Sequence, residues 1–158
     1  WHLGDKMRYK KYTLWEEACK TPLVIKAPGL TQPGSRCPSP VNLLDLYPTL
    51  SELAGLPINT ENEGNSIVPL LKDVNTEWDI PSLTTMGFNR HTVRNKKWRY
   101  IIYGGEQEEL YNHDVDPMEF TNLANDSKYQ RVKEELAKYM PKVNADPLEK
   151  VYTTKRYY

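Results

Sequence analysis

Four short segments rich in aromatic and branched side chains follow one another in the second half of the chain. Turn-forming residues such as Asn95-Lys96-Lys97 and Gly104-Gly105 separate them. This pattern is typical of β-strands joined by tight turns. It predicts a four-stranded antiparallel meander with strands over residues 83–87, 91–95, 98–103 and 108–112.

An amphipathic pattern follows the last of these segments. Apolar side chains recur at helical spacing from Tyr129 through Val132 and Leu136 to Met140, and Pro141 then ends the pattern. The apolar stripe of such a helix can be buried against one face of a sheet. We therefore expect a helix over 129–140 that packs on the meander.

The beginning of the chain suggests a helix followed by a strand. Residues 9–18 place Leu14 and Ala18 on one helical face, with charged residues elsewhere. The apolar run over 22–28 is bounded by prolines and predicts a buried strand. A loop rich in glycine and proline follows over residues 29–40.

Helical spacing returns after this loop. It predicts a helix that starts near Asp45, which acts as the N-cap, and ends at Ala54. Pro48 then lies within the first turn, where its missing N–H is not needed. A single turn or short helix is expected over 67–72. We predict an α/β fold with a boundary near residue 78, so that residues 1–78 end an α/β domain and residues 79–158 form an α+β subdomain.

Composition narrows the possible functions. The 158 residues contain 21 basic and 21 acidic side chains, so the formal net charge is zero. Nucleic-acid binding is not expected, because it relies on clustered positive charge. No apolar run approaches the roughly 20 residues that span a bilayer, so no membrane segment is expected.

Common self-contained active sites are absent from the sequence. It contains no Gly-x-Ser-x-Gly, no His-Glu-x-x-His and no glycine-rich phosphate loop. The three histidines are scattered, and Cys19 and Cys37 do not form a Cys-x-x-Cys pair, so no zinc ligand set is expected. The two cysteines could form one disulfide or remain as thiols.

A cationic cluster near the start is the main chemical feature. Aromatic neighbours can desolvate a lysine and direct it at an anion. The alternative is a solvated basic face whose lysines pair with Glu16 and Glu17. The cluster consists of Lys6, Arg8, Lys10 and Lys11, beside Tyr9, Tyr12 and Trp15.

The residues that follow Lys11 have a characteristic spacing. An aromatic residue follows Lys11 after four positions, an acid after five, and after eleven a proline that opens the apolar run. This spacing resembles the late active-site motif of the type I sulfatases. The start, Trp1-His2-Leu3-Gly4-Asp5, looks like the residues that follow the family's metal-binding Asp-His-Gly or Asp-Asn-Gly. Further similar segments are Pro40–Leu50, Leu53–Pro57, Gly64–Leu71, Trp98–Ile101, Glu109–Asn112 and Asp116–Ala124.

The resemblance implies a C-terminal fragment of a sulfatase, of the branch similar to iduronate-2-sulfatase, with an alkaline-phosphatase-like fold. Such enzymes hydrolyse sulfate esters with a formylglycine nucleophile, made in a Cys/Ser-x-Pro/Ala-x-Arg motif, and a calcium ion. Cys37-Pro38-Ser39-Pro40 does not fit that motif. Nucleophile and Ca²⁺ ligands are therefore expected upstream of residue 1. The fragment itself should bind no metal and should be inactive.

The resemblance also assigns candidate site residues. Lys11 would be catalytic and bind the sulfate group, with pairing to Glu16 or Glu17 as the structural alternative. Arg8 lies where many relatives carry a histidine that contacts substrate. Arg90 and His91 lie where relatives place residues that touch the sugar, although an exposed turn is the alternative there. His2 is expected to be structural.

The expected partners are a sulfated carbohydrate substrate and the remainder of the parent chain. By resemblance alone, the location is outside the cytosol, in a periplasm, a lysosome or a secreted space. Two alternatives remain open. One is a phosphatase or phosphodiesterase of the same superfold. The other is a carbohydrate-binding module built on the four-stranded sheet.

Overall fold

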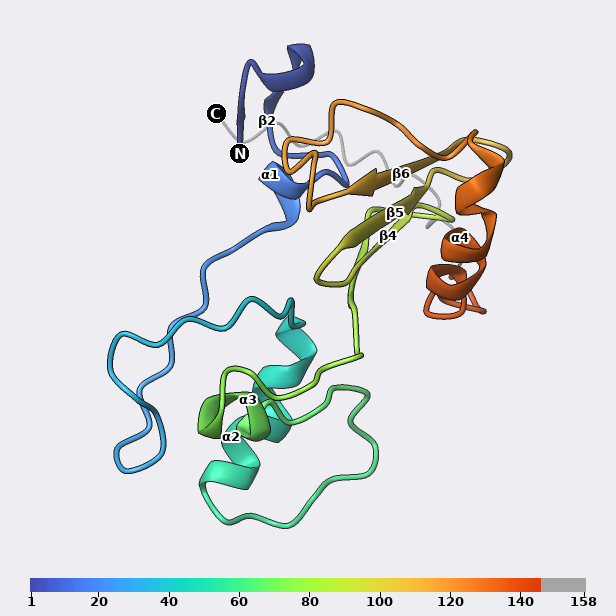
Figure 1. Ribbon diagram of the computed structural model, residues 1–158. Coiled ribbons are helices and arrows are strands. Elements are labelled where there is room, and N and C mark those ends of the chain that lie inside the picture. Colours follow the sequence, from blue (N-terminus) through green and yellow to red (C-terminus); the bar gives the residue numbers. More distant parts are fainter. Residues whose placement is uncertain (146–158) are drawn as a thin grey trace, which may run out of the picture.

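The computed structural model describes residues 1–145, and its central feature is the predicted meander (Figure 1). The strands pair antiparallel in the order β3-β4-β5-β6. The predicted four-stranded sheet is thus confirmed, with strand ends shifted by a residue or two. The strands are β3 (Ser82–Thr85), β4 (His91–Arg94), β5 (Trp98–Ile102) and β6 (Glu108–Asn112).

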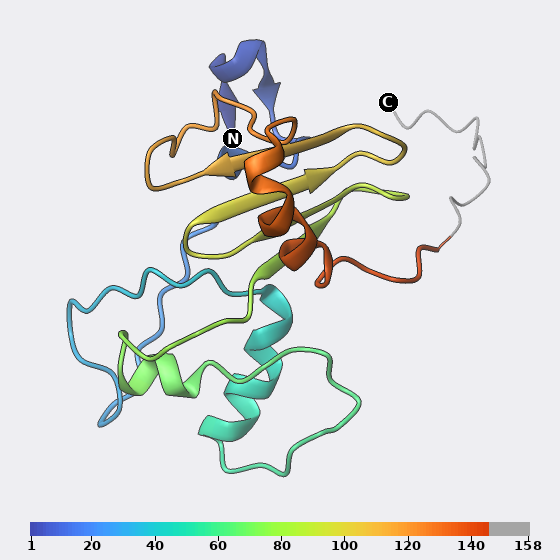
Figure 2. The same ribbon diagram turned by 45° about the vertical axis from the view of Figure 1, so that its right-hand side comes forward.

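Helix α4 (Gln130–Ala137) covers one face of the sheet, as Figure 2 shows. A single 3₁₀ turn, η3 (Ser127–Tyr129), leads into it, and the Asp126 side chain accepts a hydrogen bond from the backbone N–H of Lys128. Side chains alternate between the faces of each strand, so every second strand residue points at α4. The buried residues of this core are Val93, Tyr100, Leu110, Ala124 and Leu136.

The start of the chain covers the opposite face of the sheet. Leu14 is fully buried there against Ile101 and Tyr111. Strands β1 (His2–Leu3) and β2 (Tyr9–Lys10) form a small hairpin around the 3₁₀ turn η1 (Asp5–Met7), and α1 spans only Glu16–Cys19.

The prediction of a helix over 9–18 is therefore wrong for residues 9–15, because α1 begins only at Glu16. Tyr9 and Lys10 pair with β1 instead. Lys10 and Tyr12 have φ angles of 70° and 133°, which are incompatible with a right-handed helix. Long-range packing of Leu14 and Trp15 on the sheet has overridden the local pattern.

The predicted strand over 22–28 is also wrong. This segment has no regular structure, and Val24 is 90% exposed. A strand needs a neighbour to satisfy its backbone groups, and none of the strands among residues 1–145 pairs with this segment.

The third part of the structure contains two short helices, α2 (Leu46–Leu53) and α3 (Val68–Lys72). Both were predicted, and Pro48 lies in the first turn of α2. Asp45 precedes α2, but its carboxylate serves the preceding 3₁₀ turn, η2 (Leu43–Asp45), in a capping box with Asn42. None of the helices in residues 1–145 has the length and apolar character to cross a bilayer.

The buried Asp45 carboxylate also fixes the loop that follows α2. One oxygen accepts a hydrogen bond from the Asn42 N–H at 2.7 Å, and the other accepts one from the Asn65 N–H at 2.8 Å. Asn42 in turn accepts a hydrogen bond from the N–H of Leu83 in β3. These contacts tie the α2 region to the edge of the sheet.

We predict that Gly64→Ala destabilises the protein by about 3 kcal/mol, at the upper end of overpacking costs. A Cβ at Gly64 would lie 2.0 Å from the Leu44 carbonyl oxygen, which is backbone and cannot move aside. Gly29→Ala is the matched control, because Gly29 has a φ of 80° but no atom near its Cβ position. Its cost should be about 1 kcal/mol. Thermal unfolding of both variants checks the prediction, and equal losses would contradict it.

Candidate active site

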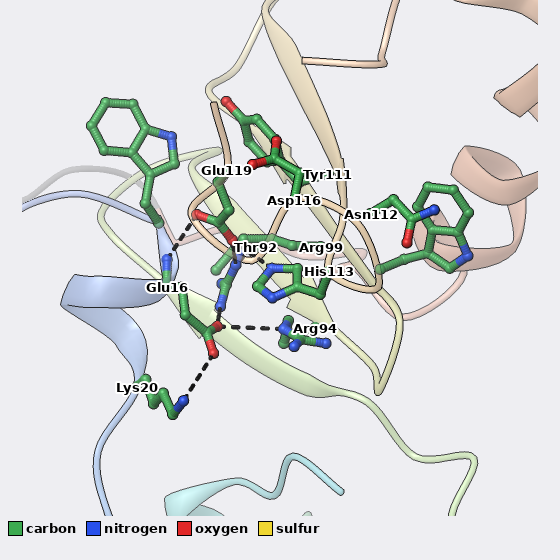
Figure 3. Close-up of polar contacts among 12 residues, drawn as sticks. Glu16, Lys20, Thr92, Arg94, Arg99, Tyr111, Asn112, His113, Asp116 and Glu119 are labelled. Atoms are coloured by element: carbon green, nitrogen blue, oxygen red, sulfur yellow. Dashed lines mark hydrogen bonds and ion pairs between the residues drawn. The ribbon is translucent and has the colours of Figure 1, made fainter. Parts of the chain in front are cut away.

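A buried guanidinium joins the start of the chain to the sheet. Arg99 in β5 is 2% exposed. Its Nη1 donates to the Leu14 carbonyl and to Thr92 Oγ1, both at 3.1 Å, and its Nη2 pairs with the carboxylate of Glu16 (Figure 3). Residues 14–16 are therefore held on the sheet by one cation as well as by the burial of Leu14.

Glu119 completes this ionic cluster from the loop after β6. Its Oε1 lies 2.5 Å from Arg99 Nε and 2.8 Å from His113 Nε2. Its Oε2 accepts a hydrogen bond from the backbone N–H of Glu16, the first residue of α1, at 2.9 Å. Glu119 is 1% exposed and has a φ of 59°, a conformation that non-glycine residues adopt only where their surroundings enforce it.

The charges of the cluster compensate one another. Burial alone would raise the pKa of Glu16, but the guanidinium groups of Arg99 and Arg94 outweigh it and hold that pKa below 4.5. Burial opposes ionisation of Glu119 as well, yet the hydrogen bond with His113 and the charge of Arg99 lower its pKa. Both carboxylates are thus kept ionised in the fold.

Glu16, His113 and Glu119 also place three potential metal-ligand atoms within 4.8 Å of one another. These carboxylates already face the cations Arg99 and Arg94, with Arg94 Nε at 3.4 Å from Glu16. Calcium requires six to eight oxygen ligands. This cluster offers two carboxylates that are already paired and a histidine, so it does not fit Ca²⁺.

A second cation lies between two aromatic rings beside the cluster. Lys6 Nζ is 4.2 Å from the centroid of the Trp15 ring and 4.4 Å from that of Tyr111, and it donates to the Tyr111 hydroxyl at 3.3 Å. Burial lowers the pKa of Lys6, although the carboxylates of Glu119 and Glu109 oppose this shift. Lys6 is thus a desolvated lysine with aromatic neighbours, the arrangement expected for the cationic cluster.

Hairpin turns bring the candidate site together at one end of the sheet. In this meander, the β3–β4 and β5–β6 turns lie at the same end. The β3–β4 turn is closed by a hydrogen bond from the Met86 N–H to the Arg90 carbonyl, and the β5–β6 turn by one from Tyr103 to Gln107. The β1–β2 hairpin, closed between Gly4 and Arg8, adjoins them from the start of the chain.

An open pocket of about 400 Å³ lies between these turns. Its wall is fixed by Glu109, whose Oε2 accepts hydrogen bonds from Trp15 Nε1 at 2.6 Å and from the Tyr111 hydroxyl at 2.9 Å. Two guanidinium groups from distant parts of the chain enter the lining. The lining residues are Arg8, Tyr12, Thr13, Trp15, Met86, Arg90, Tyr103, Gln107 and Glu109.

The structure brings together two of the four predicted site residues. Arg8 and Arg90 both line this pocket and are exposed. Lys11 is exposed next to the lining residue Tyr12, but it is not itself part of the lining. His91 is buried and does not line the pocket, and its ring nitrogens are hydrogen-bonded to Thr85 Oγ1 and Asn144 Oδ1. The functional roles of all four remain predictions.

The other expectations about single residues have clear structural counterparts. His2 is buried, bonds to Thr13 Oγ1 at 2.8 Å and packs edge-on against Trp15. Cys19 and Cys37 are unpaired thiols in the structure. Sequence reasoning missed the pocket wall that Tyr103, Gln107 and Glu109 form, since only the sheet pairing places that turn beside the start of the chain.

Backbone strain is concentrated in the segment that carries the cationic residues. Lys6, Met7, Lys10 and Tyr12 all have φ between 53° and 133°. Such conformations cost of order 1–3 kcal/mol each and gather at functional sites. This segment is therefore held in its shape by its contacts with the sheet and not by local preference.

Comparison with known proteins identifies the family. Residues 4–146 match the family described as N-sulphoglucosamine sulphohydrolase, C-terminal. The chain belongs to this family, and thereby to the sulfatases. It is 38% identical over its full length to a sulfatase from Formosa agariphila and covers 31% of that protein. It is 32% identical to a Delta 4,5-hexuronate-2-O-sulfatase from Bacteroides thetaiotaomicron, over 82% of this chain and 29% of that one.

Solved structures agree with the predicted fold class. A protein solved in complex with its substrate D-glucosamine-2-N,6-O-disulfate superposes with a TM-score of 0.69 at 21% identity, over 87% of this chain and 30% of that chain. A phosphonate monoester hydrolase from Silicibacter pomeroyi superposes with a TM-score of 0.71 at 23% identity, over 86% of this chain and 31% of that chain. The chain thus has the α/β architecture of the alkaline-phosphatase-like enzymes and spans less than a third of these proteins.

We predict that Glu119→Gln destabilises the protein by about 3 kcal/mol, because removing one partner leaves the buried Arg99 charge poorly compensated. Glu135→Gln is the matched control, since Glu135 pairs with Lys138 on the surface, where both side chains are more than half exposed. It should leave the stability nearly unchanged, because solvent screens an exposed ion pair. Urea unfolding measures both values. Equal effects would show that the buried cluster contributes no more than a surface pair.

Stability should also depend on pH through this cluster. Because Glu16 and Glu119 have lowered pKa values in the fold, the unfolded chain binds more protons as the pH falls below about 4.5. Their contribution is complete above that pH and is lost as the pH drops through the folded pKa values. Unfolding measured from pH 7 to pH 3 should show this loss. The double variant Glu16→Gln/Glu119→Gln should have a flatter profile, and an unchanged profile would contradict the assignment.

Proposed function

We propose that the full-length protein hydrolyses sulfate esters and that this chain supplies a cationic wall of its active site. The observation that carries the proposal is the family match over residues 4–146. The pocket supports it, because Arg8 and Arg90 approach it from two hairpins that lie far apart in sequence. Guanidinium groups suit anions such as sulfate, since they offer several donors in a fixed plane.

In this proposal Arg8 and Arg90 bind and orient the charged ester. Lys11, exposed beside Tyr12, carries the catalytic cation that binds the sulfate group. A preorganised cation lowers the barrier by stabilising the charge that develops in the transition state. His91, which the resemblance assigns to substrate binding, is buried with both ring nitrogens hydrogen-bonded, so in this proposal it supports the Arg90 turn instead of touching the sugar.

We assign the nucleophile and the metal ion to parts of the protein upstream of this chain. There, a formylglycine would attack the sulfur atom of the ester, and a Ca²⁺ ion would stabilise the negative charge. The described residues fit this division, since their one cluster of potential metal ligands is already paired with arginines. We therefore expect this chain alone to be inactive and to act together with the rest of the parent protein.

We further propose a sulfated carbohydrate as substrate, in the branch similar to iduronate-2-sulfatase. The similarity to a Delta 4,5-hexuronate-2-O-sulfatase favours this substrate class. We also propose a location outside the cytosol, in a periplasm, a lysosome or a secreted space. Two unpaired cysteines neither require nor oppose an oxidising compartment.

A phosphonate or phosphate ester hydrolase is the second candidate. Its support is the structural similarity to a phosphonate monoester hydrolase, which covers 86% of this chain. The similarity to the protein solved with a sulfated glucosamine covers 87%. The two candidates differ in the ester they prefer. A guanidinium pair alone does not discriminate between a sulfate and a phosphonate oxygen.

Substrate profiling of the full-length protein distinguishes these candidates. The panel contains a 2-O-sulfated unsaturated hexuronate, glucosamine 6-sulfate, N-sulfoglucosamine and phenyl phosphonate monoester. Release of sulfate from at least one sugar, with a higher kcat/KM than phosphonate hydrolysis, supports the proposal. A preference for the phosphonate ester would overturn it, and binding of glycans without any turnover would favour a carbohydrate-binding module.

We predict that Lys11→Ala lowers turnover of the preferred sulfate ester at least about tenfold, given the usual cost of losing one contact to a developing charge. Lys96→Ala is the matched control, because Lys96 is an exposed lysine in the β4–β5 turn. It should leave turnover unchanged. The measurement is kcat with the full-length variants, alongside their melting temperatures, and a Lys11→Ala enzyme with full activity would refute this role.

A further inference from the structure

A second pocket adjoins the cationic one at the β5–β6 turn. It also has a volume of about 400 Å³. Tyr103, Gln107 and Glu109 line both pockets, so the two are neighbours along one end of the sheet. The remaining lining residues of the second pocket are Glu106, Glu108, Asn122 and Asn125.

The chemistry of the second pocket differs from that of the first. No arginine or lysine is in its lining, which offers carboxylates and amides instead. Carboxylates accept hydrogen bonds, and amides both donate and accept them, so this set suits the hydroxyl groups of a sugar ring. The carboxylates of Glu106 and Glu109 form no ion pair among residues 1–145, so they repel a sulfate or a second carboxylate, whereas Glu108 is paired with Lys133.

Part of this lining is fixed before any ligand binds. Asn122 Oδ1 accepts hydrogen bonds from the N–H groups of Leu110 and Ala124, and its Nδ2 donates to the Glu108 carbonyl at 3.2 Å. The Glu108 carboxylate is held by Lys133 and by the Tyr100 hydroxyl. The amide of Asn125 and the carboxylate of Glu106 are exposed at the rim, where a ligand can reach them.

We infer that the second pocket binds the sugar residue next to the sulfated one and selects an uncharged neighbour over a sulfated one. This inference rests on the proposed function, because it takes the cationic pocket as the place of the sulfate group. The cationic pocket then binds the sulfate group, and the second pocket binds the uncharged sugar ring. The substrate class becomes an oligosaccharide in which a sulfated residue is linked to a neutral sugar.

The test uses the full-length protein and the monosulfated monosaccharide that it hydrolyses fastest. Two disaccharides extend this compound, one with an uncharged hexose and one with the same hexose carrying a sulfate. We expect the neutral disaccharide to have a kcat/KM about tenfold above the monosaccharide, mainly through KM, as one or two added hydrogen bonds would give. The disulfated compound should fall below the neutral one by a similar factor.

Two variants assign these effects to the second pocket. Asn125→Ala should reduce the advantage of the neutral disaccharide to within about threefold and leave the monosaccharide unchanged. Glu106→Gln keeps the shape but removes a charge, so it should weaken discrimination against the second sulfate about threefold. Asn75→Ala, an exposed amide beyond α3, is the control and should change neither ratio.

The outcomes separate this inference from the proposed function. Equal kcat/KM for the monosaccharide and the neutral disaccharide, or a preference for the disulfated compound, would overturn the inference while leaving sulfatase activity in place. If Asn125→Ala lowered kcat/KM equally for all three substrates, that result would also overturn the inference and leave sulfatase activity in place. Failure to release sulfate from any of the sulfated sugars, whether monosaccharide or disaccharide, would overturn the proposed function, and the inference with it.

Discussion

The buried guanidinium of Arg99 is the contact on which the candidate site depends. It binds the backbone at Leu14 and the carboxylates of Glu16 and Glu119, and so joins the start of the chain, a central strand and the loop after β6. The strained backbone from Lys6 to Tyr12 contains only part of the 3₁₀ turn η1 and the two-residue strand β2. Its position relative to the sheet is therefore set by this ionic cluster together with the burial of Leu14.

The meander adds a second constraint, which is purely topological. Alternate turns of an antiparallel sheet lie at the same end, so Arg90 and Gln107 line one pocket although they come from different turns. The sheet thus brings together residues that are far apart in the sequence. It converts short turns into adjoining surfaces with different charge, one with two arginines and one with carboxylates and amides.

The sequence predicted those parts of the fold whose causes are local. Aromatic and branched segments between turn-forming residues located β3 to β6, a short apolar run located α3, and helical spacing located α2 and α4. The β1–β2 hairpin could not be predicted, since tertiary contacts override the helical pattern of residues 9–18. Arg8 and Arg90 were identified through a family resemblance, but their meeting in one pocket was not. The partners of Arg99 were inaccessible for the same reason, because Glu16 lies 83 residues away in sequence.

These separations have a consequence for biosynthesis. The hydrogen bond from the backbone N–H of Glu16 to the side-chain carboxylate of Glu119 spans 103 residues, so it cannot form until the loop after β6 has been synthesised. Contacts of such high order form late, because the chain must first close a long loop. The ionic cluster that holds the start of the chain on the sheet can therefore be completed only after Glu119 has been synthesised.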